Sequence, residues 1–288
     1  MTVVEAAVPV RRWPLLALAA TVIAALTYLL AVWTTTGQAL ENAALRGADQ
    51  AATRDATAAS QHLAQITVYS LVIAVVVIAA IGAVRRRVDL MVAGVGIIVT
   101  GQVVVQGLKR YILPRPELVE VTGHFAANSL PSGHTTIAMT VLFATLIVVP
   151  YRWRGLAMLV VLTWAVSIGH YTLTAKWHRL SDTLAADAIS LAIACLFSWW
   201  LVRRGSVRRY TGRAKVIPVV VTVLMVGSAL LTLAMGAVLW GVPLAEEGVH
   251  TVIDDDEWNI YLGATAFASA GSVLTALTFL AAWRRLEP

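Results

Sequence analysis

The chain of 288 residues contains little charge and a single cysteine. Charged residues make up 13% of it, whereas ordinary soluble domains carry about 25%. With 59% hydrophobic residues and a mean hydropathy of +0.77, the composition excludes a soluble domain and predicts a membrane protein. Because Cys195 is the only cysteine, an intramolecular disulfide and a multi-cysteine metal site are both excluded.

The chain instead contains long apolar runs. Eight windows are long enough, or nearly so, to cross a bilayer as helices, which takes about 17–25 residues each. These windows are 13–33, 63–84, 90–108, 135–150, 156–171, 183–202, 216–240 and 261–283. Continuous apolar runs predict helices rather than the alternating strands of a barrel. We therefore expect an all-α, polytopic membrane helix bundle with about eight spans.

Basic residues gather in the connections on one side of this predicted bundle. Fifteen of the 22 fall there, namely Arg11, Arg12, Arg85–Arg87, Arg152, Arg154, the six basic residues of 203–215, Arg284 and Arg285. By the positive-inside rule, that side and both termini face the cytoplasm. Five of the other seven lie in two short outer segments, which indicates either a local function or ordinary ion pairs. The basic residues are not interleaved with aromatic ones, so no nucleic-acid partner is expected.

The basic run RRGSVRRYTGRAK divides the chain. We predict a six-helix body over 1–202, a basic cytoplasmic linker over 203–215, and a C-terminal transmembrane helix pair over 216–288. An acidic loop joins the last two helices on the outer side, and its four successive carboxylates lack the alternating spacing of a calcium site. The polar, Ala-rich segment 34–62 is expected to form an amphipathic helix on the outer surface.

Polar residues are concentrated in three outer segments, and the second of these, NSLPSGHTT (128–136), has the features of an anion site. Pro131 breaks the incoming chain, Ser132 is a good N-cap, and Gly133 allows a ligand to approach the backbone. The free N–H groups at such a helix start bind phosphate. His134 on the first turn can then donate a proton to a leaving oxygen. The alternative is an ordinary N-cap with a bystander histidine.

The third segment, WHRLSD (177–182), pairs a histidine with a carboxylate. His178 and Asp182 are four residues apart, so they share one face of a helix. A carboxylate that accepts the Nδ1–H leaves Nε2 as a nucleophile or base. A purely structural His–Asp pair is the alternative. Asp187 lies deeper and points nearly the opposite way, so we expect it to have a separate role or a structural partner.

The first segment, KRYILPRP (109–116), supplies cations. Lys109 and Arg115, with Arg110 beside them, suit phosphoryl oxygens, although long basic side chains at span ends also reach for lipid headgroups. The convergence of these cations, a helix-start anion site and an oriented histidine on one membrane face favours a phosphate site.

The three segments together resemble the signature motifs of the type 2 phosphatidic acid phosphatase superfamily of integral-membrane lipid phosphatases. That family has a Lys followed by Arg-Pro, then Pro-Ser-Gly-His, then Ser-Arg with a later His and an Asp four residues beyond it. The resemblance implies that His178 attacks phosphorus to form a phosphohistidine, that His134 protonates the leaving oxygen, and that Asp182 orients His178. It also implies phosphate binding by Lys109, Arg115, Ser132 and Gly133, with neither metal nor cofactor.

Two departures from the family pattern concern the cations. Five residues separate Lys109 from Arg115, where the family usually has six. The Ser-Arg pair of the third motif is replaced by Tyr171-Thr172, so one cation is missing. Arg110, His170, Lys176 or Arg179 can substitute for it, and the shortened spacing favours Arg110.

The resemblance implies a metal-independent lipid phosphatase whose site faces the outside or periplasm of a cell (inner) membrane. Its substrate would be a polyprenyl pyrophosphate, phosphatidic acid or phosphatidylglycerol phosphate, and its other partners membrane lipids. The Ala-, Val- and Arg-rich, Lys-poor composition suggests a bacterial protein. One alternative is a catalytically weakened protein of the same fold that binds or moves a lipid or regulates a partner. Another is transfer of the phosphoryl group to an acceptor other than water.

Overall fold

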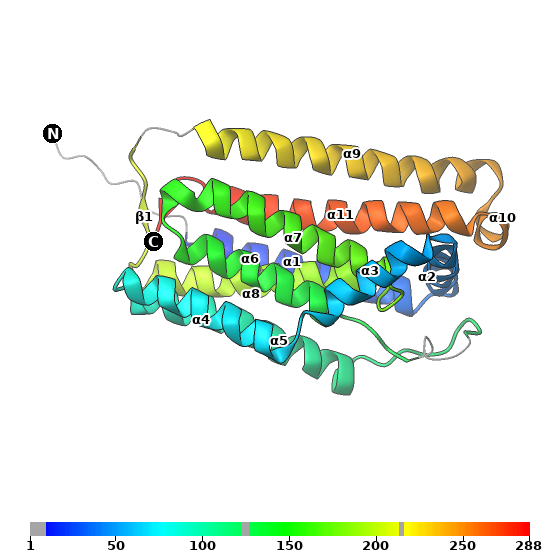
Figure 1. The fold of residues 1–288 in the computed structure, drawn as a ribbon, viewed down its shortest axis with the longest axis horizontal. Coiled ribbons are helices and arrows are strands. Elements are labelled where there is room, and N and C mark those ends of the chain that lie inside the picture. The colour runs from blue at the N-terminus through cyan, green and yellow to red at the C-terminus, as the bar shows by residue number, and fades with distance from the viewer. Residues whose placement is uncertain (1–9, 122–126, 213–215) are drawn as a thin grey trace.

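The apolar runs form long helices because a bilayer core offers no other partner for backbone N–H and C=O groups. The computed structural model describes residues 10–121, 127–212 and 216–288 (Figure 1). The start of the predicted body, residues 122–126 between the first and second outer segments, and the end of the predicted linker lie outside the described residues. The elements are α1 (Arg12–Val32), α2 (Thr35–Gly47), η1 (Ala48–Gln50), α3 (Thr53–Ala64), α4 (Val68–Val84), α5 (Val88–Gly107), η2 (Leu108–Ile112), α6 (Gly133–Val148), η4 (Tyr151–Trp153), α7 (Arg154–Thr174), α8 (Leu180–Arg203), β1 (Arg208–Arg209), α9 (Val216–Glu246), α10 (Val249–Asp255), α11 (Glu257–Ala282) and β2 (Leu286–Glu287).

The predicted all-α, polytopic helix bundle is confirmed. Each of the eight predicted windows lies on a helix, these being α1, α4, α5, α6, α7, α8, α9 and α11. By length and composition, six helices of the described chain are able to cross a membrane, and α3 with α4 makes a seventh if that pair, bent by 58°, is one span. The remaining window is α6, which has only 16 residues.

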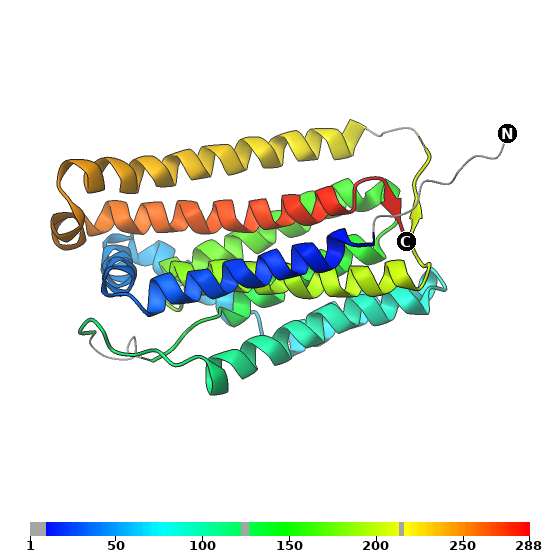
Figure 2. The ribbon, with the colours of Figure 1, turned by 180° about the vertical axis from the view of Figure 1, so that it is seen from behind.

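The two ends of the bundle differ in what they carry. At one end β1 and β2 pair antiparallel, Arg208 with Glu287, and the C-terminus lies there (Figure 1). At the other end lie α2, α3 and α10, the end of α7 and the start of α8, as the view from behind also shows (Figure 2). Because α5 ends, and α6 and α8 begin, at this second end, the three polar segments meet there.

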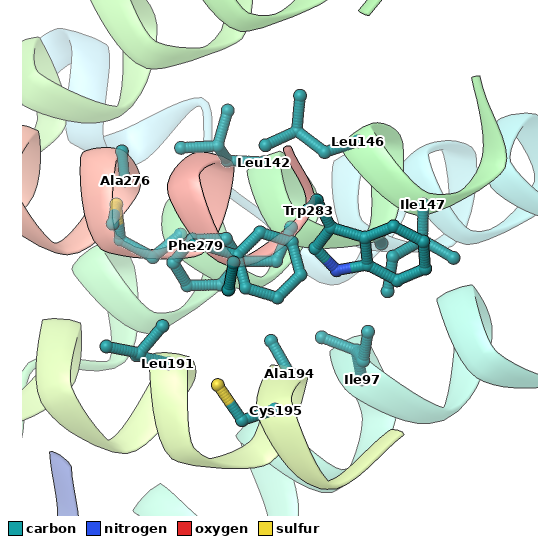
Figure 3. Close-up of a cluster of buried hydrophobic side chains, with 14 of the residues drawn as sticks. Ile97, Leu142, Leu146, Ile147, Leu191, Ala194, Cys195, Ala276, Phe279 and Trp283 are labelled. Carbon is teal, nitrogen blue, oxygen red and sulfur yellow. The ribbon is translucent and has the colours of Figure 1, made fainter. Parts of the chain in front are cut away.

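The last helix, α11, is built into the central core. Phe279 and Trp283 of α11 lie among the buried side chains of Leu142, Leu146 and Leu191 (Figure 3). Phe279 packs on Phe143 with ring centroids 4.6 Å apart, and Trp283 donates a hydrogen bond of 3.1 Å from its Nε1 to Ser198 Oγ. Deeper in the bundle, Asp187 accepts a 2.9 Å hydrogen bond from Ser272, so this carboxylate has a structural partner on α11. The division of the chain into a six-helix body, a linker and a helix pair stays a prediction.

Candidate active site

The starts of α6 and α8 lie side by side. The Ser132 N–H donates a 2.9 Å hydrogen bond to the Asp182 carbonyl, which joins the two helix starts. As the sequence predicted, Ser132 is the N-cap of α6, and its Oγ accepts the Thr135 N–H at 3.3 Å. Gly133 is the first residue of α6, and a Cβ there would lie 3.3 Å from Gln106 Nε2. A side chain at position 133 would therefore contact the Gln106 amide, whereas glycine leaves this helix start, whose N–H groups attract anions, without a side chain.

A histidine and a carboxylate meet at the start of α8. His178 Nδ1 lies 3.0 Å from Asp182 Oδ2, and the same oxygen accepts the Arg179 N–H at 3.0 Å. Asp182 is fully buried and His178 is 8% exposed. A buried carboxylate that accepts two N–H groups holds the proton on Nδ1, which leaves the Nε2 lone pair of His178 available. This is the arrangement that a nucleophilic histidine requires.

His134 faces this pair from the first turn of α6. Its ring centroid lies 6.2 Å from that of His178, with the two ring planes inclined by 61°. Its other neighbour is Trp177, whose ring lies edge to face at 5.3 Å. At this separation one phosphoryl group can contact both imidazoles, since attack requires about 3–3.5 Å and proton transfer about 2.6–3.2 Å between heavy atoms.

The predicted phosphate-binding cations Lys109, Arg115 and Arg110 differ in their burial and in their contacts. Lys109, in the π-helical turn η2, is partly buried and interacts electrostatically with both Asp182 and His134. The Arg115 side chain is 5% exposed, and its Nη1 lies 3.7 Å from Glu41 Oε2. Arg110, which the spacing favoured as the substitute cation, is exposed. Lys109 and Arg115 are thus held within the site end of the bundle.

Thr172, which stands at the position of the missing arginine, has a structural role. Its hydroxyl donates to the Gly169 carbonyl at 2.7 Å, and its own carbonyl accepts the N–H groups of Trp177 and His178. It braces the turn that leads into α8 and brings no cation to the site.

Of the four possible substitutes for the missing cation, Arg179 is the one that is buried beside the His–Asp pair. Its Nη1 donates to Ser129 Oγ at 3.1 Å, and its Nη2 donates to Asn42 Oδ1 at 3.4 Å. Burial, and then repulsion from Arg115, lowers the pKa of Arg179 from its ordinary value. Lys176 forms an ion pair of 2.6 Å with Asp49.

A cavity of about 400 Å³ adjoins the pair. It is lined by His178, Arg179, Lys176, Trp177, Ala175, Ala127, Ser129 and Leu45. It therefore has the nucleophile candidate and two cations in its wall. Among the residues that the structure describes, no group of three or more His, Cys, Asp or Glu is placed to hold a metal ion.

One part of the site was not recognised in the sequence. The helix α2 turns a polar face inward, and Gln38, Glu41 and Asn42 on that face are 2%, 7% and 4% exposed. Glu41 Oε1 accepts the Ser181 N–H at 3.0 Å, directly at the start of α8. The signal was present as an amphipathic helix with polar residues at positions 38, 41 and 42, which share one helix face.

Glu41 is a buried carboxylate among charges. Burial raises its pKa to about 7, and repulsion from Asp182 acts in the same direction. The hydrogen bond from Ser181 and the cations Arg179 and Arg115 oppose this rise.

Comparison with known proteins gives one match. The model of the PAP2 superfamily matches residues 89–206. The matched segment contains all three polar segments and the His178–Asp182 pair, whereas α2, α9 and α11 lie outside it. No curated protein and no solved structure matches the chain.

Proposed function

Since the chain belongs to the PAP2 superfamily, whose members are generally phosphatases, we propose that it is a membrane lipid phosphatase that works through a phosphohistidine. The observation that carries this proposal is the geometry of three side chains. Asp182 fixes the tautomer of His178, and the ring centroid of His134 lies 6.2 Å from that of His178, so one phosphoryl group can contact both imidazoles.

The reaction has two balanced steps. In the first, Nε2 of His178 attacks phosphorus, the bond between phosphorus and the lipid oxygen breaks, and His134 gives its proton to that oxygen. In the second, His134 takes a proton from water, the water oxygen bonds to phosphorus, and the N–P bond breaks. His178 is regenerated and inorganic phosphate leaves.

Phosphate binding relies on the start of α6 and on the cations around it. Lys109, Arg115, the Ser132 hydroxyl and the Gly133 N–H hold the nonbridging oxygens, and Arg179 takes the place of the missing arginine. Donors fixed in a buried site stabilise the charge that develops in the transition state better than water does. No step requires a metal ion or cofactor.

The substrate is a lipid phosphate monoester or pyrophosphate. The site lies at the end of the bundle opposite the basic connections, so by the positive-inside rule it faces the outside or periplasm of the cell (inner) membrane. A long-chain substrate places its phosphate at this level while its tail stays in the leaflet. A polyprenyl pyrophosphate, phosphatidic acid and phosphatidylglycerol phosphate all fit this description.

The test is hydrolysis of a panel of these three lipids by the purified protein in detergent. We expect phosphate release from at least one, together with a transient ³²P label on the protein that is stable in base and lost in acid, as a phosphoramidate is. Binding of the lipids without release or label would instead favour the catalytically weakened, lipid-binding alternative. Label without release in water, but with release to an added alcohol, would favour phosphotransfer.

Arg179 is expected to matter for catalysis and Arg110 is not. Replacing Arg179 with alanine removes one preorganised cation and should lower kcat by about 10²–10³-fold. Arg110→Ala, which removes a neighbouring exposed arginine, is the matched control and should stay close to wild type. Steady-state kinetics on the best lipid substrate measure both. A large loss in Arg110→Ala with little loss in Arg179→Ala would reverse the assignment.

A further inference from the structure

The helix α2 holds the loop that carries Arg115. Tyr28 OH, on α1, donates to the Pro114 carbonyl at 2.6 Å, and Gln38 Nε2 donates to the Pro116 carbonyl at 2.7 Å. The Leu118 N–H donates to Gln38 Oε1 at 3.3 Å. The backbone is thus fixed on both sides of Arg115 by residues that lie outside the segment shared with the PAP2 superfamily. This positions the arginine before any ligand arrives.

The Glu41 carboxylate lies between the start of α8 and Arg115, where a bound anion would lie. One of its oxygens accepts a backbone N–H from the first turn of α8, and the other faces Arg115 at 3.7 Å. Helix starts and arginine pairs are what proteins use to bind phosphate. The carboxylate therefore lies where the cations of the site would otherwise attract a phosphate oxygen.

The contact between Glu41 and Arg115 is loose. Among the described residues, Glu41 Oε2 and both terminal nitrogens of Arg115 are buried without a hydrogen-bond partner. Buried guanidinium N–H groups left without acceptors are costly, so Arg115 is poised to accept a better-placed anion. A phosphate that reaches it then shares a buried space with two carboxylates, Glu41 and Asp182.

We propose that Glu41 is a positioning residue that serves as a resident counter-anion of Arg115, and that it must take up a proton for a phosphate group to bind with full affinity. The inference rests on the proposed function in that it concerns the same phosphate site. It deepens that function by making phosphate affinity depend on the charge of Glu41, a residue other than the two proposed catalytic histidines, His178 and His134.

The charged groups around Glu41 give the direction of the effect. Asp182 of α8 repels it, and Arg179 and Arg115 attract it. On α11, the neighbouring carboxylate Glu257 is paired with Arg46 of α2. With its pKa raised to about 7, Glu41 is neutral below that pH and charged above it. Phosphate affinity should accordingly fall as the pH rises above about 7.

The experiment measures binding of sulfate, which carries no proton over the range used, by calorimetry on the full-length protein. Between about pH 5.5 and 8.5, wild type should lose affinity above pH 7 and take up protons on binding. Glu41→Gln keeps an acceptor for the Ser181 N–H but loses the charge, so at pH 8 it should bind sulfate about tenfold more tightly than wild type. With the lipid substrate, its KM at pH 8 should fall more than its kcat changes.

Two further variants complete the design. Glu41→Asp keeps the charge and should keep the pH dependence, and Glu257→Gln, which removes a carboxylate of another ion pair of α2, should match wild type. A flat wild-type profile without proton uptake, or a Glu41→Gln protein that binds sulfate more weakly at every pH, would overturn the proposal. Because histidine side chains also titrate in this pH range, the decisive reading is a smaller proton uptake in Glu41→Gln than in wild type and Glu41→Asp, and equal uptake in all three would overturn the proposal as well. Absence of lipid hydrolysis by wild type would instead count against the proposed function.

Discussion

Replacing His178 with alanine is expected to reduce phosphate release from the lipid substrate by about 10⁴–10⁶-fold, because no other side chain can take over a covalent step. His178 is the histidine whose Nδ1 is held by the buried Asp182, at 3.0 Å, and whose ring faces the adjoining cavity. The remaining cations and helix N–H groups still bind phosphate, so KM should change much less than kcat. The ³²P label on the protein should disappear altogether.

Two controls separate chemistry from folding. His178→Gln retains a side chain that can donate a hydrogen bond to the buried Asp182 carboxylate, so it avoids the cost of leaving that carboxylate without this partner. It should nevertheless be as inactive as the alanine variant. His62→Ala removes another histidine at the same end of the bundle, one stacked on Tyr171 at 5.1 Å, and should keep near wild-type activity. Activity of His178→Ala within tenfold of wild type would rule out the phosphohistidine mechanism.

The arrangement of the helices and the placement of the main candidate site residues followed from the sequence for simple reasons. Apolar runs of span length have no alternative to helix in a bilayer, so all eight windows were found. Since alternate connections lie on the same side of a membrane, the end of α5 and the starts of α6 and α8 were expected on one face, and the structure brings the starts of α6 and α8 into contact. The four-residue spacing then placed Asp182 beside His178, and Ser132 was recognisable as a cap.

Other features depend on tertiary contacts that no local pattern encodes. An amphipathic helix reveals a polar face, but not whether that face turns toward water or inward. Only the structure shows that Glu41 reaches Ser181, 140 positions along the chain. Hydropathy likewise does not distinguish a lipid-facing helix from a central one, since both are apolar, so the packing of Phe279 in the core was not foreseen.

The choice between Arg110 and Arg179 illustrates a third limit of sequence patterns. The shortened spacing of the first motif suggested that Arg110 points toward the site. In the structure that stretch is a π-helical turn over Leu108–Ile112, and Arg110 within it is exposed, so its role as the substitute cation stays a prediction. Arg179 directly follows His178, so the orientation of α8 carries it into the wall of the same cavity.

Replacing His134 with alanine is expected to slow lipid phosphate hydrolysis by about 10²–10⁴-fold, the usual contribution of general acid–base catalysis. The loss should depend on the leaving group. An alkoxide or lipid phosphate must receive a proton as it departs, whereas the phenolate of an aryl phosphate departs without one. The first step should therefore remain fast in His134→Ala when the substrate is p-nitrophenyl phosphate, and only the second step, which needs His134 as a base, should be slow.

This difference gives a distinctive measurement. With the aryl substrate, rapid mixing of His134→Ala should show a burst of nitrophenol close to one equivalent of enzyme, followed by slow turnover, and the phosphohistidine should accumulate. With the lipid substrate there should be no burst, because the first step is itself impaired. His134 also packs against Trp177, so Trp177→Ala tests whether lost packing alone produces the pattern. Equal slowing of both substrates without a burst would show that His134 is not the acid.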